Sequence, residues 1–173
     1  MFVNLDEAKK LIQEGRVLHI AADESMLEQL PKGSWIGGTT PYFITEQGGT
    51  FCKDKLFVNE FSFATDYKIM VYDESNIMNI PEDAYQNGIT FLVMPFASDV
   101  AVFYSKEAPY SDKLFMNPTV GWISGFDLST DSVAKVYYGV TGTSYSDKAV
   151  AMHNCLPDDK VASLGIVNVF NTD

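Results

Sequence analysis

The sequence predicts one domain, residues 1–173, of the α/β to α+β class, with a mixed β-sheet and helices packed on it. Short apolar runs of strand length alternate along the chain with amphipathic runs of helical period. Hydrophobic residues make up 46% and charged residues 20%, which is typical of a chain with a packed core. One phrase is also repeated. Trp35-Ile36-Gly37-Gly38 returns as Trp122-Ile123-Ser124-Gly125, and each copy closes a helix, strand, helix, strand succession.

The expected helices carry signals at their ends. Asn4 can cap the first helix and Gly15 can end it, whereas Asp23 and Ser98 can cap two others, because their side chains accept hydrogen bonds from free N–H groups. Pro81 suits the first turn of a helix, since it has no N–H to leave unpaired. The expected helices are residues 5–14, 23–30, 73–80, 81–88 and 98–107.

The expected strands are apolar or alternating runs bounded by turn residues. Ile89 to Met94 is apolar throughout, as in a strand buried on both faces. Gly139 to Ser144 is expected as a hairpin turn, and Gly48-Gly49 as a break. The expected strands are residues 17–21, 34–37, 42–45, 56–63, 67–72, 89–94, 120–128, 134–140, 149–156 and 164–170.

The repeated phrase suggests an internal duplication, residues 5–45 and 81–128. A strand, helix, strand connection normally joins parallel strands, so each copy is expected to contribute a parallel pair. Chance recurrence of a short phrase is the alternative. The last expected strand lies almost at Asp173, which fits either a natural edge strand or the N-terminal part of a longer chain.

The charge excludes several classes of partner. The formal net charge is −11, with 23 acidic and 12 basic residues, so binding to nucleic acid or to an anionic membrane is not expected. The sequence contains no apolar run of the roughly 18 residues that span a bilayer, and its first residues lack the order of a signal peptide. Two cysteines, Cys52 and Cys155, make no disulfide framework, so we expect free thiols and a cytoplasmic location.

The best candidate for a ligand site is the loop after the first tryptophan strand. Gly37 and Gly38 let a ligand approach the backbone, and the hydroxyls of Thr39 and Thr40 can hydrogen-bond it. The corresponding edge in the second copy consists of Ser124 and Gly125. The expected ligand is a small polar or anionic metabolite. The alternative is a bulge or bend, because no lysine follows the glycines as it would in a phosphate-binding loop.

A catalytic or metal site has weaker support. His153 and Cys155 share one face of an expected strand, and a hydrolase could use them, but side chains pointing outward together do not aim at each other. A zinc ion would need about two more ligands. We therefore expect no metal, no cofactor and no catalytic residue, with Cys155 acting as a small buried hydrophobic residue.

Two stretches resemble the N-terminal region of FIST sensory proteins. They are Leu18 to Ala22 followed by Trp35 to Thr40, and Asn87 to Pro95 followed by Ser98. The resemblance covers most of the chain and implies an apolar strand, a helix and a second strand ending in a Gly/Ser/Thr motif. It also implies a cytoplasmic small-ligand sensor attached to a signalling module. The family's motif typically includes a cysteine, which Gly37 to Thr40 lacks.

The leading hypothesis is a cytoplasmic, bacterial, non-enzymatic domain that binds a small ligand and acts as a sensor. Its expected partners are the metabolite and either a signalling protein or further copies of itself. Two alternatives stay open: a hydrolase-like enzyme using His153 and Cys155, and an assembly domain with an exposed aromatic patch.

Overall fold

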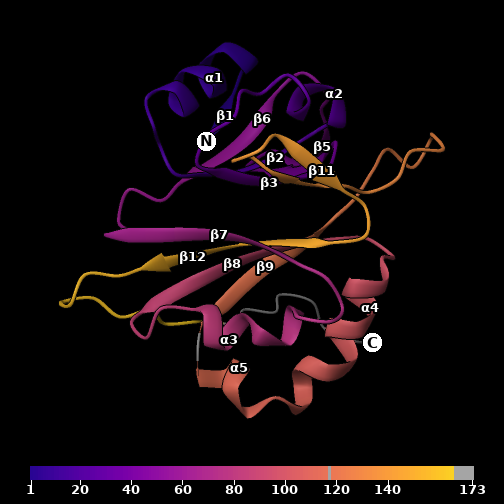
Figure 1. The fold of residues 1–173 in the computed structure, drawn as a ribbon. Coiled ribbons are helices and arrows are strands. Elements are labelled where there is room, and N and C mark those ends of the chain that lie inside the picture. Colours follow the sequence, from indigo (N-terminus) through magenta and orange to yellow (C-terminus); the bar gives the residue numbers. More distant parts are fainter. Residues whose placement is uncertain (117, 166–173) are drawn as a thin grey trace.

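The computed structural model describes residues 1–116 and 118–165, and it has four layers (Figure 1). Two β-sheets are stacked face to face, and helices cover the outer face of each sheet. The expected class, with mixed sheets and packed helices, is confirmed, although two large sheets stand where one was expected. The helices are α1 (Leu5–Gln13), α2 (Glu24–Leu27), α3 (Ile80–Asp83), α4 (Asp99–Glu107) and α5 (Asp112–Met116).

The first sheet, which α1 and α2 cover, has the strand order β1-β6-β2-β3-β10-β11. β2 and β3 are parallel, with Leu18 opposite Trp35 and Ala22 opposite Thr39, and the other neighbours are antiparallel. The strands are β1 (Phe2–Val3), β6 (Leu56–Glu60), β2 (Leu18–Ala22), β3 (Trp35–Thr39), β10 (Val136–Tyr138) and β11 (Thr143–Tyr145).

The second sheet, which α3 and α4 cover, has the order β7-β12-β8-β9. β8 and β9 are parallel, with Val93 opposite Trp122, and β12 is antiparallel to both β7 and β8. Each large sheet therefore contains the expected parallel pair joined by a helix, β2-α2-β3 and β8-α4-β9. The strands are β7 (Asp66–Tyr72), β12 (Ala149–Cys155), β8 (Gly88–Pro95) and β9 (Thr119–Ser124).

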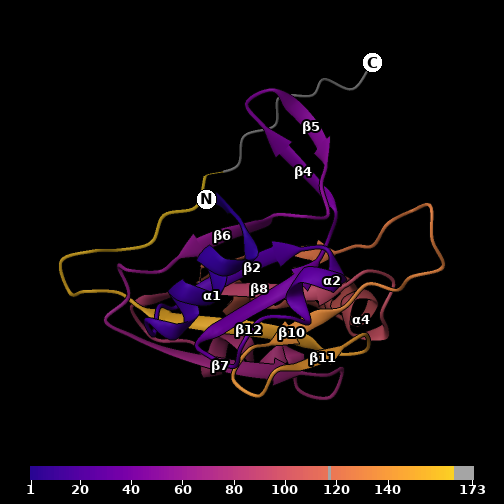
Figure 2. The same ribbon diagram turned by 90° about the horizontal axis from the view of Figure 1, so that it is seen from above.

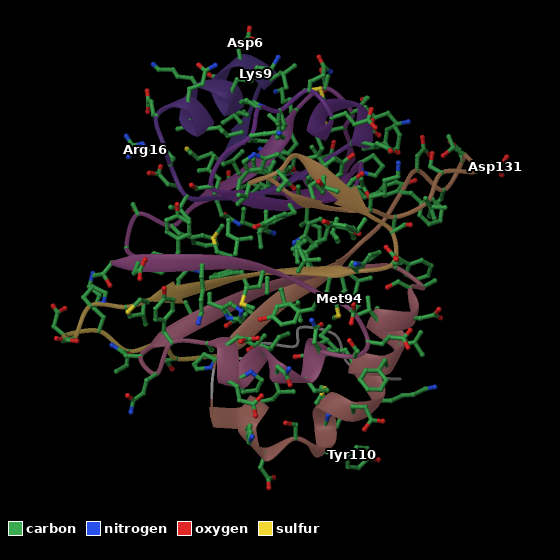
Figure 3. The ribbon with its side chains drawn as sticks, viewed as in Figure 1. Asp6, Lys9, Arg16, Met94, Tyr110 and Asp131 are labelled. Atoms are coloured by element: carbon green, nitrogen blue, oxygen red, sulfur yellow. The ribbon has the colours of Figure 1, made fainter. Side chains whose placement is uncertain are left out.

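Three apolar clusters fill the interfaces between the four layers. One lies between α1, α2 and the first sheet and includes Trp35, and a second lies between α3, α4 and the second sheet. The third fills the space between the sheets and includes Ile36, Val93 and Met152. Asp6 and Lys9 point away from the sheets on the outer side of α1, as its amphipathic sequence predicts (Figure 3).

A separate hairpin, β4 (Tyr42–Thr45) and β5 (Gly48–Phe51), projects from the body between β3 and β6 (Figure 2). Here the sequence prediction was wrong, since Gly48 and Gly49 begin a strand instead of breaking one. Gly48 adopts a φ of 107°, which a residue without a Cβ reaches easily, and this conformation turns the chain at the hairpin tip.

Other differences are local. The helices expected at 73–80 and 81–88 are replaced by a 3-10 turn, Ile77–Asn79, and by the short α3, whereas β1, β11 and α5 were not expected. Of the last expected strand, residues 164–165 have no regular structure and residues 166–170 lie outside the described part. The duplication of 5–45 and 81–128 stays a prediction.

Candidate functional site

The carboxyl ends of β3 and β9 are hydrogen-bonded to each other. The Gly125 N–H donates to the Thr39 carbonyl at 2.7 Å, and Thr39 Oγ1 donates to the Gly125 carbonyl at 2.6 Å. The Lys135 N–H donates in turn to Thr39 Oγ1 at 2.9 Å. The structure thus brings together the two loops that the repeated phrase selected. It also shows that the Thr39 hydroxyl is engaged by main-chain groups.

The glycine before Thr39 marks a close approach of the two sheets. A Cβ atom on Gly38 would lie 2.8 Å from Ser124 Cβ and 2.8 Å from Val93 Cγ1. On Gly37 it would lie 2.6 Å from the Ile20 carbonyl oxygen. Gly37, Gly38 and Ser124 are buried, so their part of the predicted site packs the interior.

A cavity of about 310 Å³ opens beside Thr39, at the carboxyl ends of β2, β3 and β9. Open sheets containing parallel strands commonly bind ligands at this end, because the loops that follow the strands converge there. Figure 3 labels Asp131 in the β9–β10 loop, which projects from the body beside this end of the sheets. The cavity is lined by Asp23, Glu24, Ser25, Glu28, Thr39, Thr40, Pro41, Lys53, Phe126, Asp127, Ser132 and Val133.

The cavity is acidic. Four carboxylates and one ammonium group line it, and a second ammonium, that of Lys135, pairs with Glu24. The pKa of Tyr137 in the adjacent core is raised first by its burial and then by the negative charges of Glu24, Glu28 and Asp23. A cation is therefore favoured in the cavity over an anion.

Lys53 reaches the cavity from the chain that follows β5. Its Nζ lies 2.6 Å from Asp127 Oδ2 and 3.8 Å from Asp23 Oδ2. The hydrogen bond from Lys53, with others from Ser129, lowers the pKa of the Asp127 carboxyl to about 2, so Asp127 is ionised at neutral pH. Asp23 also caps α2, because its Oδ1 accepts from the Ser25 N–H at 3.1 Å.

Sequence reasoning found only part of this site. Thr39 and Thr40 line the cavity, and Gly125 bonds Thr39, but the carboxylates and Lys53 were not selected. The sequence did contain an indication of these acids, since Asp23 directly follows β2 and Asp127 follows shortly after β9. Asp23 was expected to cap a helix, and acids are common at helix starts, so no ligand role was inferred for Asp23.

The histidine of the alternative enzyme hypothesis is enclosed. His153 is 0% exposed, and both ring nitrogens have partners: Nδ1 lies 2.8 Å from Thr90 Oγ1 and Nε2 lies 2.8 Å from Tyr72 Oη. Tyr72 donates its proton to Asp83 at 2.9 Å, so its oxygen accepts from His153. Cys155 is half-buried and its Sγ lies 3.7 Å from the Leu156 carbonyl oxygen. This arrangement gives His153 no path to a substrate.

The second histidine, His19, accepts a hydrogen bond that links the two sheets. The Trp122 indole donates to His19 Nε2 at 2.6 Å, and Asn59 Nδ2 lies 3.4 Å from His19 Nδ1. An indole N–H can only donate, so His19 must be unprotonated at Nε2. Burial supports this state by lowering the pKa of His19 to about 4.

Two further properties bear on function. In residues 1–116 and 118–165, no group of three or more His, Cys, Asp and Glu side chains is arranged to hold a metal ion. In the same part of the chain, no helix has both the length and the apolar character needed to cross a bilayer.

Residues 3–173 match the model of a protein family of unknown function, DUF6976. No curated protein and no solved structure matches the chain. The resemblance to FIST proteins stays an expectation.

Proposed function

We propose that this chain, which belongs to the DUF6976 family of unknown function, is a non-enzymatic domain that binds a small organic cation, an amine, in the acidic cavity. The observation that supports this most is the lining of the cavity by four carboxylates and one ammonium group. Its position at the carboxyl ends of β2, β3 and β9 adds to this support, because ligands of such sheets commonly bind there.

The carboxylates differ in how fully they are engaged. Asp127 Oδ1 accepts from the Ser129 N–H and hydroxyl, and Oδ2 accepts from Lys53, so this side chain is held in place. Asp23 Oδ2 lies 3.8 Å from Lys53 Nζ, beyond hydrogen-bond distance, and is placed to accept from a ligand. Glu28 is exposed at the rim. A primary amine, with three N–H donors, suits these acceptors.

The charge of the cavity changes the class of ligand that we expect. Sequence reasoning predicted a small polar or anionic metabolite, and the charge of the cavity favours a polar cation. Because both cysteines are free, we also propose that the protein is cytoplasmic.

Calorimetric titration with 1,4-diaminobutane and spermidine, with citrate as the anionic comparison, tests this function. The decisive variant is Asp23→Asn, which removes a charge from the cavity and keeps an oxygen able to cap α2. We expect amine binding that weakens with salt, and a loss of about fivefold in affinity in Asp23→Asn.

Asp158→Asn is the matched control, because Asp158 is exposed and is not among the residues of the cavity. It should bind amines like the wild type. Binding of citrate but not of the amines, or an equal loss in both variants, would contradict the proposal.

A further inference from the structure

The chain already places an ammonium group of its own in the acidic cavity. Lys53 Nζ lies between Asp127 and Asp23, and 5.5 Å from the centroid of the Phe51 ring. Carboxylates and aromatic faces both attract ammonium ions in proteins. Lys53 therefore occupies the position that the proposed function gives to a ligand.

Lys53 also follows an element that is separate from the two large sheets. It follows the β4–β5 hairpin, which pairs with neither large sheet and projects from the body (Figure 2). An isolated two-stranded hairpin is marginally stable in water, so this one depends on contacts at its base. Besides Lys53, they include the Leu128 N–H, which donates to Tyr42 Oη at 3.2 Å, and Phe43, whose ring lies 5.0 Å from that of Phe2.

We propose that Lys53 is a displaceable internal occupant of the site, so that an amine binding between Asp23 and Asp127 expels the Lys53 side chain and loosens the β4–β5 hairpin. This inference rests on the proposed function and adds a conformational consequence of ligand binding, namely a looser β4–β5 hairpin. The Lys53 side chain is 42% exposed, so water and salt screen its ion pairs and an amine can compete with them.

The β4–β5 hairpin is placed to change its stability when a ligand occupies the cavity. Ile44 is 93% exposed and Phe51 52% exposed on a segment whose closing hydrogen bond, from the Cys52 N–H to the Pro41 carbonyl at 2.8 Å, lies next to Lys53. Pro41 itself lines the cavity. A change at the cavity thus acts directly on the base of the hairpin.

The first measurement is the affinity of Lys53→Met for 1,4-diaminobutane. Methionine keeps an unbranched apolar side chain and removes the ammonium. If the ion pairs keep Lys53 in place with an equilibrium of about five to one, their loss should tighten binding about sixfold.

Lys55→Met is the matched control for the general effect of losing a positive charge. Lys55 Nζ lies 5.9 Å from the centroid of the Phe2 ring, and Lys55 is not part of the cavity lining. Its loss should change the affinity much less than sixfold. Equal tightening in the two variants would overturn the inference, because the charge of the protein would then explain the effect.

Hydrogen exchange at the amides of residues 42–51 is the second measurement. The amine should accelerate exchange in the wild type, and Lys53→Met should exchange quickly without any ligand. Wild-type exchange in unliganded Lys53→Met would overturn the inference. If amines bind normally and both Lys53 results are negative, the proposed function survives alone. If no amine binds wild type or Lys53→Met, the function fails and displacement by an amine fails with it.

Discussion

The two β-α-β units, β2-α2-β3 and β8-α4-β9, have the same connection but place their tryptophans on opposite faces. Trp35 faces α1 and α2, whereas Trp122 faces the other sheet and donates to His19. Each tryptophan pairs with a residue five positions before a helix cap. Trp35 pairs with Leu18, before the Asp23 cap, and Trp122 pairs with Val93, before the Ser98 cap.

The path between strand and helix explains the difference. β2 ends directly before the cap of α2, but two residues separate β8 from the cap of α4, and one of them, Ala97, has a φ of 57°. An offset of two residues does not by itself change which face of a strand turns toward its helix, because side chains alternate with a period of two. The left-handed backbone at Ala97 instead redirects the chain, so residues at the same distance from the two caps lie on opposite faces of their sheets. A repeated phrase therefore does not imply a repeated environment.

Replacing each tryptophan with alanine tests this difference between the two units. Of the changes considered, it should have the largest effect on the free energy of unfolding. Trp35 is 1% exposed and donates through Nε1 to the Pro31 carbonyl at 2.9 Å, so Trp35→Ala should lower the free energy of unfolding by about 4 kcal/mol. Trp122 is half-buried, and Trp122→Ala should lower it by about half as much. Urea unfolding followed by circular dichroism measures both values. Equal losses would mean that the two environments are equivalent after all.

Much of the fold was predictable because its signals are local. Ile89 to Met94 is apolar throughout, and the structure places these residues inside β8. Asn4, Asp23 and Ser98 each cap a helix as expected, since capping depends on a side chain and the N–H groups two or three residues along the chain.

What the sequence did not predict depends on distant segments. The division into two sheets follows from which strands pair, and β12 pairs with β7 and β8 from far along the chain. The cavity also depends on segments that are far apart in the sequence. Lys53 and Asp127 form an ion pair although they lie far apart in the sequence, and nothing local distinguishes them from ordinary surface charges. The repeated phrase placed Thr39 and Gly125 in one candidate site, and the two residues lie together in the structure; that they bind a ligand stays a prediction.

Acid provides the next largest effect, through two buried histidines, one of which, His19 of the first unit, accepts a hydrogen bond from Trp122 of the second unit. The pKa of an unfolded histidine is about 6.5, and burial lowers that of His19 to about 4 and that of His153 to about 4. The unfolded chain then binds protons first as the pH falls. Stability should be complete above pH 6.5 and decline toward pH 4, by up to about 3 kcal/mol for each histidine.

Urea unfolding of the wild type and of His19→Gln between pH 7.5 and 4.5 measures this decline. Glutamine keeps an oxygen that can accept from the Trp122 indole, and it does not titrate. The variant should lose about half of the pH dependence, because the buried chain of Thr90, His153 and Tyr72 remains. An unchanged decline would show that His19 is protonated in the folded protein as readily as in the unfolded chain.

The matching glycines of the two phrases give the smallest and most local test. A Cβ on Gly38 would lie 2.8 Å from both Ser124 and Val93 in the interior between the sheets, whereas one on Gly125 would meet no atom within 4 Å. Gly38→Ala should therefore destabilise the protein by about 1–3 kcal/mol through overpacking. Gly125→Ala should stay within about 0.5 kcal/mol of the wild type. Thermal unfolding compares the two variants directly. A larger loss in Gly125→Ala would mean that the second phrase, and not the first, lies at the closest approach of the sheets.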